Sequence, residues 1–293
     1  MNHAVMKNLC GLILSGIFML FSAGVQAGFQ EGMKAYMGGN FSLALKEFKA
    51  QAEKGSAAAQ FWLGWLYHEG DGVPRDETAA MTWYTKAAQQ GHVEAISAIA
   101  EMYDKGYGVT QDYAQAAMWY RKAAAKGSAL AQYRLGVMYG FGLGVAKDEQ
   151  QAMSWYLNAA QLGNADAQFR LGNIYRIGKG VAQDYKTAVS WYFQAVQLGS
   201  VEAQRELAEM YRKKLGGEEL YQEVESWYRR LAEHEKQVAE EQARTEAEAR
   251  GVEPHKTEEQ TKSAVTEERK MLPKVLLKLE TDPTVVGSPP PSH

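Results

Sequence analysis

Apolar residues recur along this chain at the spacing of an α-helix. Ala59, Leu63 and Tyr67 lie four residues apart, so a helix would place all three on one face. The same set returns at steps of 36 residues. Its later members are Ala95, Ile99 and Tyr103, then Ala131, Leu135 and Tyr139, then Ala167, Leu171 and Tyr175. A period between about 20 and 50 residues is typical of a solenoid of stacked units. The pattern therefore predicts an all-α solenoid of helix-turn-helix repeats with a 36-residue period.

Glycine and aspartate separate the two helices of each unit. The first turn reads Gly70-Asp-Gly-Val-Pro-Arg-Asp76, and it recurs at 106–112, 142–148 and 178–184. The first glycine can take the left-handed conformation that ends a helix, and the aspartate can cap the next helix. Two glycines around one residue also suggest a phosphate-binding loop, but such a loop follows a strand. This turn lies between helices and repeats, so we interpret it as structural.

The second helix of each unit carries a Trp-Tyr dipeptide beside alanines. Trp83-Tyr84 returns with its tryptophan at positions 119, 155, 191 and 227. This regularity predicts that the tryptophans form the stacking core. In the first helix, Gly64, Gly136 and Gly172 follow the aliphatic residue, with Ala100 in the second unit. A residue with little or no side chain would let a neighbouring helix approach closely.

These signals divide the chain into six segments. We expect a secretory signal peptide at 1–27, an N-terminal capping hairpin at 28–55, four full repeats at 56–199, a degenerate fifth repeat or C-terminal cap at 200–232, a charged helical extension at 233–250 and a mostly disordered, proline-containing tail at 251–293. Within the tail, Met271 to Leu279 predicts either a marginal helix or a short docking peptide.

The first 27 residues have the pattern of a cleaved signal. Lys7 precedes an apolar run from Leu9 to Phe21, and Val25-Gln-Ala27 supplies small residues for cleavage. The run is short for a spanning helix, which needs about 20 apolar residues, so we expect no stable membrane anchor after cleavage. An uncleaved anchor is the alternative. Cys10 is the single cysteine and would leave with the signal. We expect an exported protein, in the periplasm or released from the cell.

Composition and charge point away from several function classes. The net charge is −3, whereas nucleic-acid-binding domains are strongly basic. No histidine lies in an HExxH setting, and the mature chain would have no cysteine nucleophile. Glu94, Glu101 and Asp104 suggest a metal cluster, but no histidine accompanies them at matching spacing, which favours a solvated acidic face. We therefore expect no catalytic residues, no cofactor and no metal site.

The repeat resembles a known family. Ala129 to Gly163 contains the pattern Ala-x-Ala-Gln, Leu-Gly-x-x-Tyr, Gly-x-Gly-Val-x-x-Asp, Trp-Tyr-x-x-Ala-Ala and a final glycine. This is similar to the Sel-one-like repeat family, a relative of the tetratricopeptide repeat, over about residues 56–232. The resemblance implies a right-handed α-superhelix whose first helices line the concave side. It also implies a role in holding other proteins, in envelope assembly, signalling or host contact for exported bacterial members. A cysteine-rich branch shows penicillin binding, which is not carried over because its paired cysteines are absent here.

Positions opposite the packed face of the first helices are the candidate partner-binding groove. They lie about 140° to 220° from Leu63 on a helical wheel, and they vary while the skeleton repeats. The candidates are Phe61, Trp65, His68, Glu101, Tyr133, Phe169, Asn173 and Arg176. Aromatic residues of this kind are enriched at binding hot spots. The alternative is that the aromatic side chains pack against neighbouring helices or the N-terminal cap.

The leading functional hypothesis is an exported, non-enzymatic scaffold that binds a protein or peptide segment in this groove. A cell-wall hydrolase is a rival, although the sequence offers no convergent catalytic groups. A third hypothesis makes the solenoid a rigid arm that presents a C-terminal docking tail.

Overall fold

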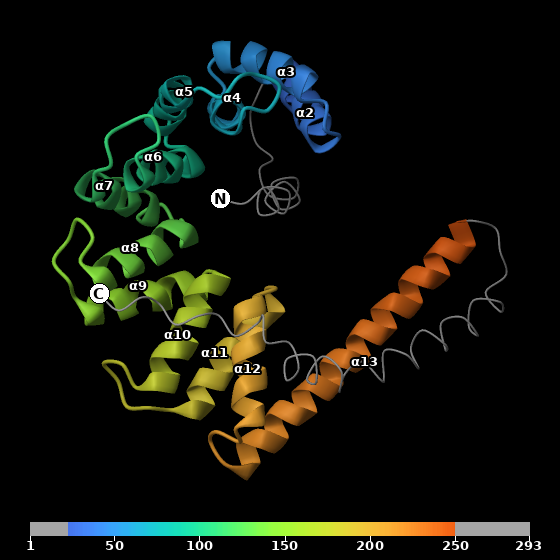
Figure 1. Cartoon of the computed structure of the whole chain (residues 1–293). Helices are drawn as coiled ribbons and strands as arrows, with labels where there is room; N and C mark the ends of the chain where they lie inside the picture. Colours follow the sequence, from blue (N-terminus) through green and yellow to red (C-terminus); the bar gives the residue numbers. More distant parts are fainter. Residues whose placement is uncertain (1–22, 250–293) are drawn as a thin grey trace. The chain divides into compact units, whose positions relative to one another are not determined.

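The computed structural model describes residues 23–249, and every regular element within that range is a helix. Residues 1–22 of the predicted signal, Cys10 among them, lie outside the described residues. So does the whole predicted tail at 251–293, including Met271 to Leu279. The helices, coloured along the chain in Figure 1, are α2 (Ala23–Met37), α3 (Phe41–Glu53), α4 (Ala57–Glu69), α5 (Glu77–Gln89), α6 (Val93–Lys105), α7 (Tyr113–Ala124), α8 (Ala129–Phe141), α9 (Glu149–Gln161), α10 (Ala165–Ile177), α11 (Tyr185–Gln197), α12 (Val201–Arg212) and α13 (Glu218–Ala249). None of the helices within 23–249 is long and apolar enough to cross a membrane.

The predicted fold class is confirmed. The hairpins α4–α5, α6–α7, α8–α9 and α10–α11 follow one another at the predicted step. Two boundaries differ in detail from the sequence pattern. α2 begins at Ala23 and so runs across the expected cleavage site after Ala27, and α13 continues without a break across residue 232. The contacts divide the chain into two compact units, Met1–Leu171 and Gly172–His293.

The turns and caps have the roles that their residues predict. Gly70 ends α4 with φ +80°, and Asp76 accepts a hydrogen bond of 2.9 Å from the backbone N–H of Ala79. The second glycine of the turn has a further role. Gly144 has φ +64°, and a Cβ there would collide with the backbone of Tyr113 at the start of α7. This glycine therefore lets the turn of one repeat lie against the second helix of the preceding repeat.

The prediction that the tryptophans form the stacking core is wrong, because the adjacent tyrosines occupy it. Tyr156 is 6% exposed, while Trp155 is only half-buried. A Cβ added at Gly136 would lie 2.6 Å from the Tyr156 ring, so the glycine gives the tyrosine its space. Gly64 with Tyr84, and Gly172 with Tyr192, repeat this arrangement. The expected close approach at these glycines is confirmed.

The tryptophans pack on the outside of that core. Trp83, Trp119 and Trp155 are partly buried against it. The ammonium groups of Lys86 and Lys122 each lie 3.9 Å from the centroid of the tryptophan three residues before them. An ammonium over an indole face is a favourable cation–π contact. The side chains of Trp227 and Tyr228 lie outside those that the structure describes.

Candidate functional site

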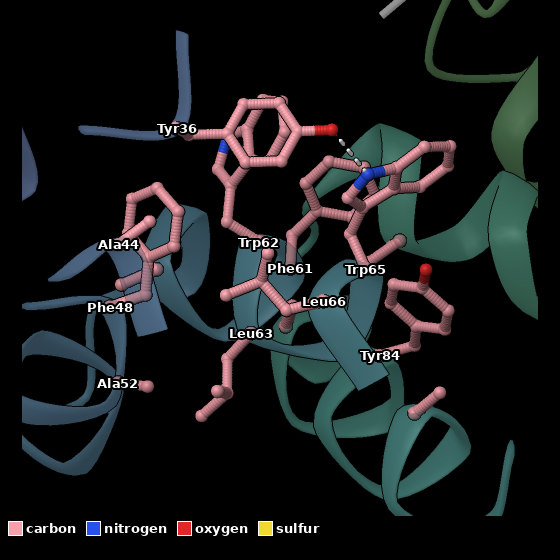
Figure 2. Packing of buried hydrophobic residues seen from close by; sticks show 14 of the residues in the cluster. Tyr36, Ala44, Phe48, Ala52, Phe61, Trp62, Leu63, Trp65, Leu66 and Tyr84 are labelled. Carbon is pink, nitrogen blue, oxygen red and sulfur yellow. Dashed lines mark hydrogen bonds between the residues drawn. The ribbon is translucent and has the colours of Figure 1, made fainter. Parts of the chain in front are cut away.

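Two of the candidate groove residues are buried at the N-terminal end. Phe61 and Trp65 are each 3% exposed, which corrects the expectation that they face a groove. The indole N–H of Trp65 donates a hydrogen bond of 3.0 Å to the hydroxyl of Tyr36 on α2, as Figure 2 shows. The Phe61 ring stacks on His92 at 5.0 Å between centroids. The physical reason is that the hairpin α2–α3 and the start of α6 cover these side chains, so they belong to the core.

The third residue of α4 in this set, His68, joins a polar and aromatic cluster. Its Nδ1 atom lies 2.7 Å from a carboxylate oxygen of Glu77, and Arg75 pairs with the same carboxylate. The ring of Tyr107, in the turn of the next repeat, lies 5.3 Å from that of His68. Tyr107 also lies 5.7 Å from the Arg75 guanidinium. His68 therefore has partners within the fold and connects the first repeat to the second.

Glu101 forms an ion pair between the second and third repeats. Its carboxylate lies 3.9 Å from the guanidinium of Arg134 on α8, and both side chains are mostly buried. Asp104, one turn further along α6, is 8% exposed. The Nε atom of Arg134 is buried without a hydrogen-bond partner. Glu101 thus acts within the fold as half of an inter-repeat pair.

Asn173 and Arg176 form a denser network in the second unit. Arg176 donates a hydrogen bond of 3.1 Å to the Tyr192 hydroxyl, which in turn donates one of 3.1 Å to the Asn173 side-chain oxygen. Arg176 also lies 3.5 Å from the carboxylate of Glu206 on α12. Burial raises the pKa of Tyr192 to about 12, although the hydrogen bond from Arg176 lowers it. These polar groups satisfy one another.

Tyr133 and Phe169 remain as half-buried aromatic residues on the predicted face. The Tyr133 ring lies 6.0 Å from that of Tyr156. Around Tyr133, the neighbouring positions of α8 carry small or apolar residues, Val137 and Gly140, which are also half-buried. The structure therefore divides the candidate residues into three groups. Those of α4 are covered by other parts of the fold or have partners within it. Glu101, Asn173 and Arg176 interact with other residues of the chain, whereas α8 keeps an accessible face.

Sequence reasoning missed two arginines beside that face. Arg134 and Arg170 hold equivalent positions in α8 and α10, and Arg170 is exposed. The signal was available in the spacing, because Glu101 and Arg134 are 33 residues apart and Val137 and Arg170 are also 33 apart. A search for opposite charges at that spacing would have found the Glu101–Arg134 pair and shown Arg170 as the arginine without an acidic residue at that spacing. Within the described part of the chain, no group of three or more acidic, histidine or cysteine side chains is placed to hold a metal ion.

The fold is that of a helical-repeat protein. The residues that differ from repeat to repeat lie on the first helix of each repeat. The chain belongs to the Sel1 repeat family. The family pattern matches residues 57–92, 93–128, 129–164 and 165–200, one residue later than the register 56–199 that the sequence suggested. Proteins with Sel1 repeats generally mediate protein–protein interactions and are generally non-catalytic scaffolds.

Solved structures support this membership. A Sel1 repeat protein from Oxalobacter formigenes is 32% identical, with a TM-score of 0.63, over 71% of this chain and 88% of that one. The c5321 protein, a protective antigen of uropathogenic Escherichia coli with an SLR fold, is 38% identical with a TM-score of 0.58, over 72% of this chain and 45% of that one.

A curated relative matches a shorter stretch. The exopolysaccharide production negative regulator of Rhizobium leguminosarum bv. viciae is 37% identical over 62 residues, which is 21% of this chain. The match spans only 23% of that regulator's own length.

Proposed function

We propose that this protein is an exported, non-enzymatic scaffold that binds a segment of a partner protein along the first helices of its third and fourth repeats. The observation that carries the proposal is the contrast along the variable face. Phe61 and Trp65 are buried, whereas Tyr133 and Phe169 are half-buried on helices of an interaction repeat. Aromatic side chains that keep accessible surface are suited to anchor a bound segment.

The first residues of the chain support export. Lys7, the apolar run from Leu9 to Phe21 and the small residues before Gly28 follow the pattern of a cleaved signal. A role in the bacterial envelope or in host contact agrees with the two relatives named as a protective antigen and as a regulator of exopolysaccharide production. The periplasm is the proposed location, and release from the cell is its alternative.

The binding test starts from affinity capture with the full mature chain, followed by a direct titration with the purified partner. Tyr133→Ala and Phe169→Ala should each weaken that titration. Met118→Ala is the matched control, since Met118 is 39% exposed on α7, away from the first helices. If both aromatic variants bind as the unaltered chain does while remaining folded, the proposed binding face is wrong.

Export is tested separately by fractionating the native cells and measuring the intact mass of the protein. We expect a soluble periplasmic species that begins at Gly28. A full-length species in the membrane fraction would instead support the uncleaved anchor.

Deleting residues 251–293 separates the scaffold from the rigid-arm hypothesis. Retained partner binding is expected, because the proposed contacts lie on α8 and α10. Loss of binding on deletion would assign the recognition to the tail.

A further inference from the structure

The ion pairs between successive first helices follow a common placement, and one location lacks its acidic member. Glu101 of α6 pairs with Arg134 of α8 across the second and third repeats. In the second unit, Arg176 of α10 pairs with Glu206 of α12, which holds the position equivalent to Arg134 with the opposite charge. At the corresponding location between the third and fourth repeats, the residues of α8 are Val137 and Gly140, opposite Arg170. Neither residue can supply a carboxylate.

Arg170 consequently has no ion pair and no hydrogen bond from its side chain to any residue within 23–249. Arg170 is exposed, and it interacts electrostatically with Tyr156. Burial raises the pKa of Tyr156 to about 12, and the positive charge of Arg170 opposes this by lowering the pKa. Asp166 lies one helical turn before Arg170 but makes no ion pair with it.

The hydroxyl of Tyr156 is a second unused donor at this location. Its counterpart in the next repeat, Tyr192, exchanges hydrogen bonds with Asn173 and Arg176. For Tyr156 the equivalent positions are Val137 and Gly140, and the described residues give its hydroxyl no hydrogen-bond partner. A Cβ at Gly140 would lie 3.8 Å from that hydroxyl, so the missing side chain leaves space beside it.

We infer that this location, formed by Tyr133, Val137, Gly140, Tyr156 and Arg170, receives the carboxylate of an aspartate or glutamate side chain from the bound partner segment. The incoming carboxylate would accept hydrogen bonds from the Arg170 guanidinium and the Tyr156 hydroxyl. A carboxylate is the matching acceptor for a guanidinium, because charge-assisted bonds between them are short and strong. The half-buried Tyr133 ring would contact the neighbouring part of the segment. This inference rests on the proposed function and specifies the chemistry of its ligand.

The test uses the full mature chain and three pools of N-acetylated hexapeptides that carry Glu, Gln or Lys at the third position and neutral residues elsewhere. All three are amidated at the C-terminus, so the side chain is the only source of negative charge. Binding is followed by fluorescence anisotropy at low and high salt. We expect the Glu pool to bind at least about tenfold more tightly than the Gln pool, with the preference falling as salt rises.

Three variants locate the preference. Arg170→Gln should abolish it, because the cation is removed from an exposed position. Val137→Glu should also weaken binding of the Glu pool, because it supplies within the chain the carboxylate that Glu101 supplies one repeat earlier. Val137→Gln is the matched control and should keep the preference, since it adds the same bulk without the charge.

Equal binding of the Glu and Gln pools, or a preference that survives Arg170→Gln, would overturn the acid site. The scaffold function would then stand or fall by the Tyr133 and Phe169 variants, which measure a native partner. A fourth pool with a free C-terminal carboxylate and no acidic side chain tests the other source of the charge. If it binds more tightly than the Glu pool, the inferred side-chain ligand is wrong.

Discussion

The two ends of the first unit use the same positions of the repeat in opposite ways. Next to the capping hairpin, the column that begins with Trp65 is closed, since Trp65 donates to Tyr36 and is 3% exposed. Two repeats later the same column carries Val137, which is half-buried, and Arg170 of the next repeat forms no ion pair with any described residue. A column that varies in sequence can therefore serve packing at one end of a solenoid and remain available for binding at another. Variation alone does not identify a binding surface.

The largest expected effect is a difference in stability between substitutions at a packed position and at an accessible position of this column. Trp65→Ala should lower the free energy of unfolding by about 3–5 kcal/mol, because it empties a buried aromatic site and removes the hydrogen bond from the indole to the Tyr36 hydroxyl. Val137→Ala, the same position two repeats later, should cost about 1 kcal/mol, because that side chain is only half-buried. Urea titrations followed by circular dichroism measure both. Equal losses of stability would contradict the distinction between the buried position of Trp65 and the half-buried position of Val137.

The next largest expected difference in stability is between the adjacent residues Tyr156 and Trp155 of α9. Tyr156→Ala should cost about 3–5 kcal/mol, since the ring is 6% exposed against Gly136. Trp155→Ala should cost about 1–2 kcal/mol, because Trp155 is only partly buried on the outside of the core. The same denaturant titration compares the adjacent residues. A larger loss of stability for Trp155→Ala than for Tyr156→Ala would instead support the prediction that the tryptophans form the stacking core.

Gly136 tests how tightly the Tyr156 ring is packed. An alanine Cβ would lie 2.6 Å from the Tyr156 ring, so Gly136→Ala should destabilise the protein by about 1–2 kcal/mol despite the better helix propensity of alanine. Ala100→Gly, in the repeat that naturally has alanine, should cost about 1 kcal/mol from propensity alone. Thermal unfolding of both variants checks the signs. A stabilising Gly136→Ala would show that the tyrosine can move aside.

The smallest predicted effect concerns pH at the closed end. His92 caps α6 by accepting from the backbone N–H of Ala95 at 3.4 Å through Nδ1, which requires the neutral ring. Burial lowers the pKa of His92, while Glu94 opposes this by raising it. Because the unfolded chain binds the proton more readily, this contribution to stability is present above the usual histidine pKa and decreases as the pH falls below it.

His92→Ser should remove that pH dependence and keep a cap, since Ser56 and Ser128 cap the equivalent helices. The expected difference is about 1 kcal/mol between pH 7.5 and pH 5, the scale of an N-cap interaction. Unfolding free energies of both proteins across this range provide the measurement. An identical pH profile for His92→Ser would assign the dependence to other groups.

The sequence by itself determined the repeat, its turns and its caps. These features depend on contacts within a few residues, such as Asp76 with Ala79, or on glycines whose backbone conformation only they adopt readily. The 36-residue spacing then requires similar units to stack, so the fold class followed from local signals.

Only the tertiary structure decided which side chain of each pair lies inside and which variable positions stay accessible. The helical wheel placed Trp65 outside because it considered one helix, whereas the hairpin α2–α3 covers that side. Adjacent Trp and Tyr residues differ by about 100° around a helix, and the direction of the neighbouring glycine selects the tyrosine. The 33-residue spacing can draw attention to Arg170, but only the packed structure shows that no other described residue forms an ion pair with it. Burial and pairing depend on what packs from elsewhere in the chain, and a periodic pattern does not contain that information.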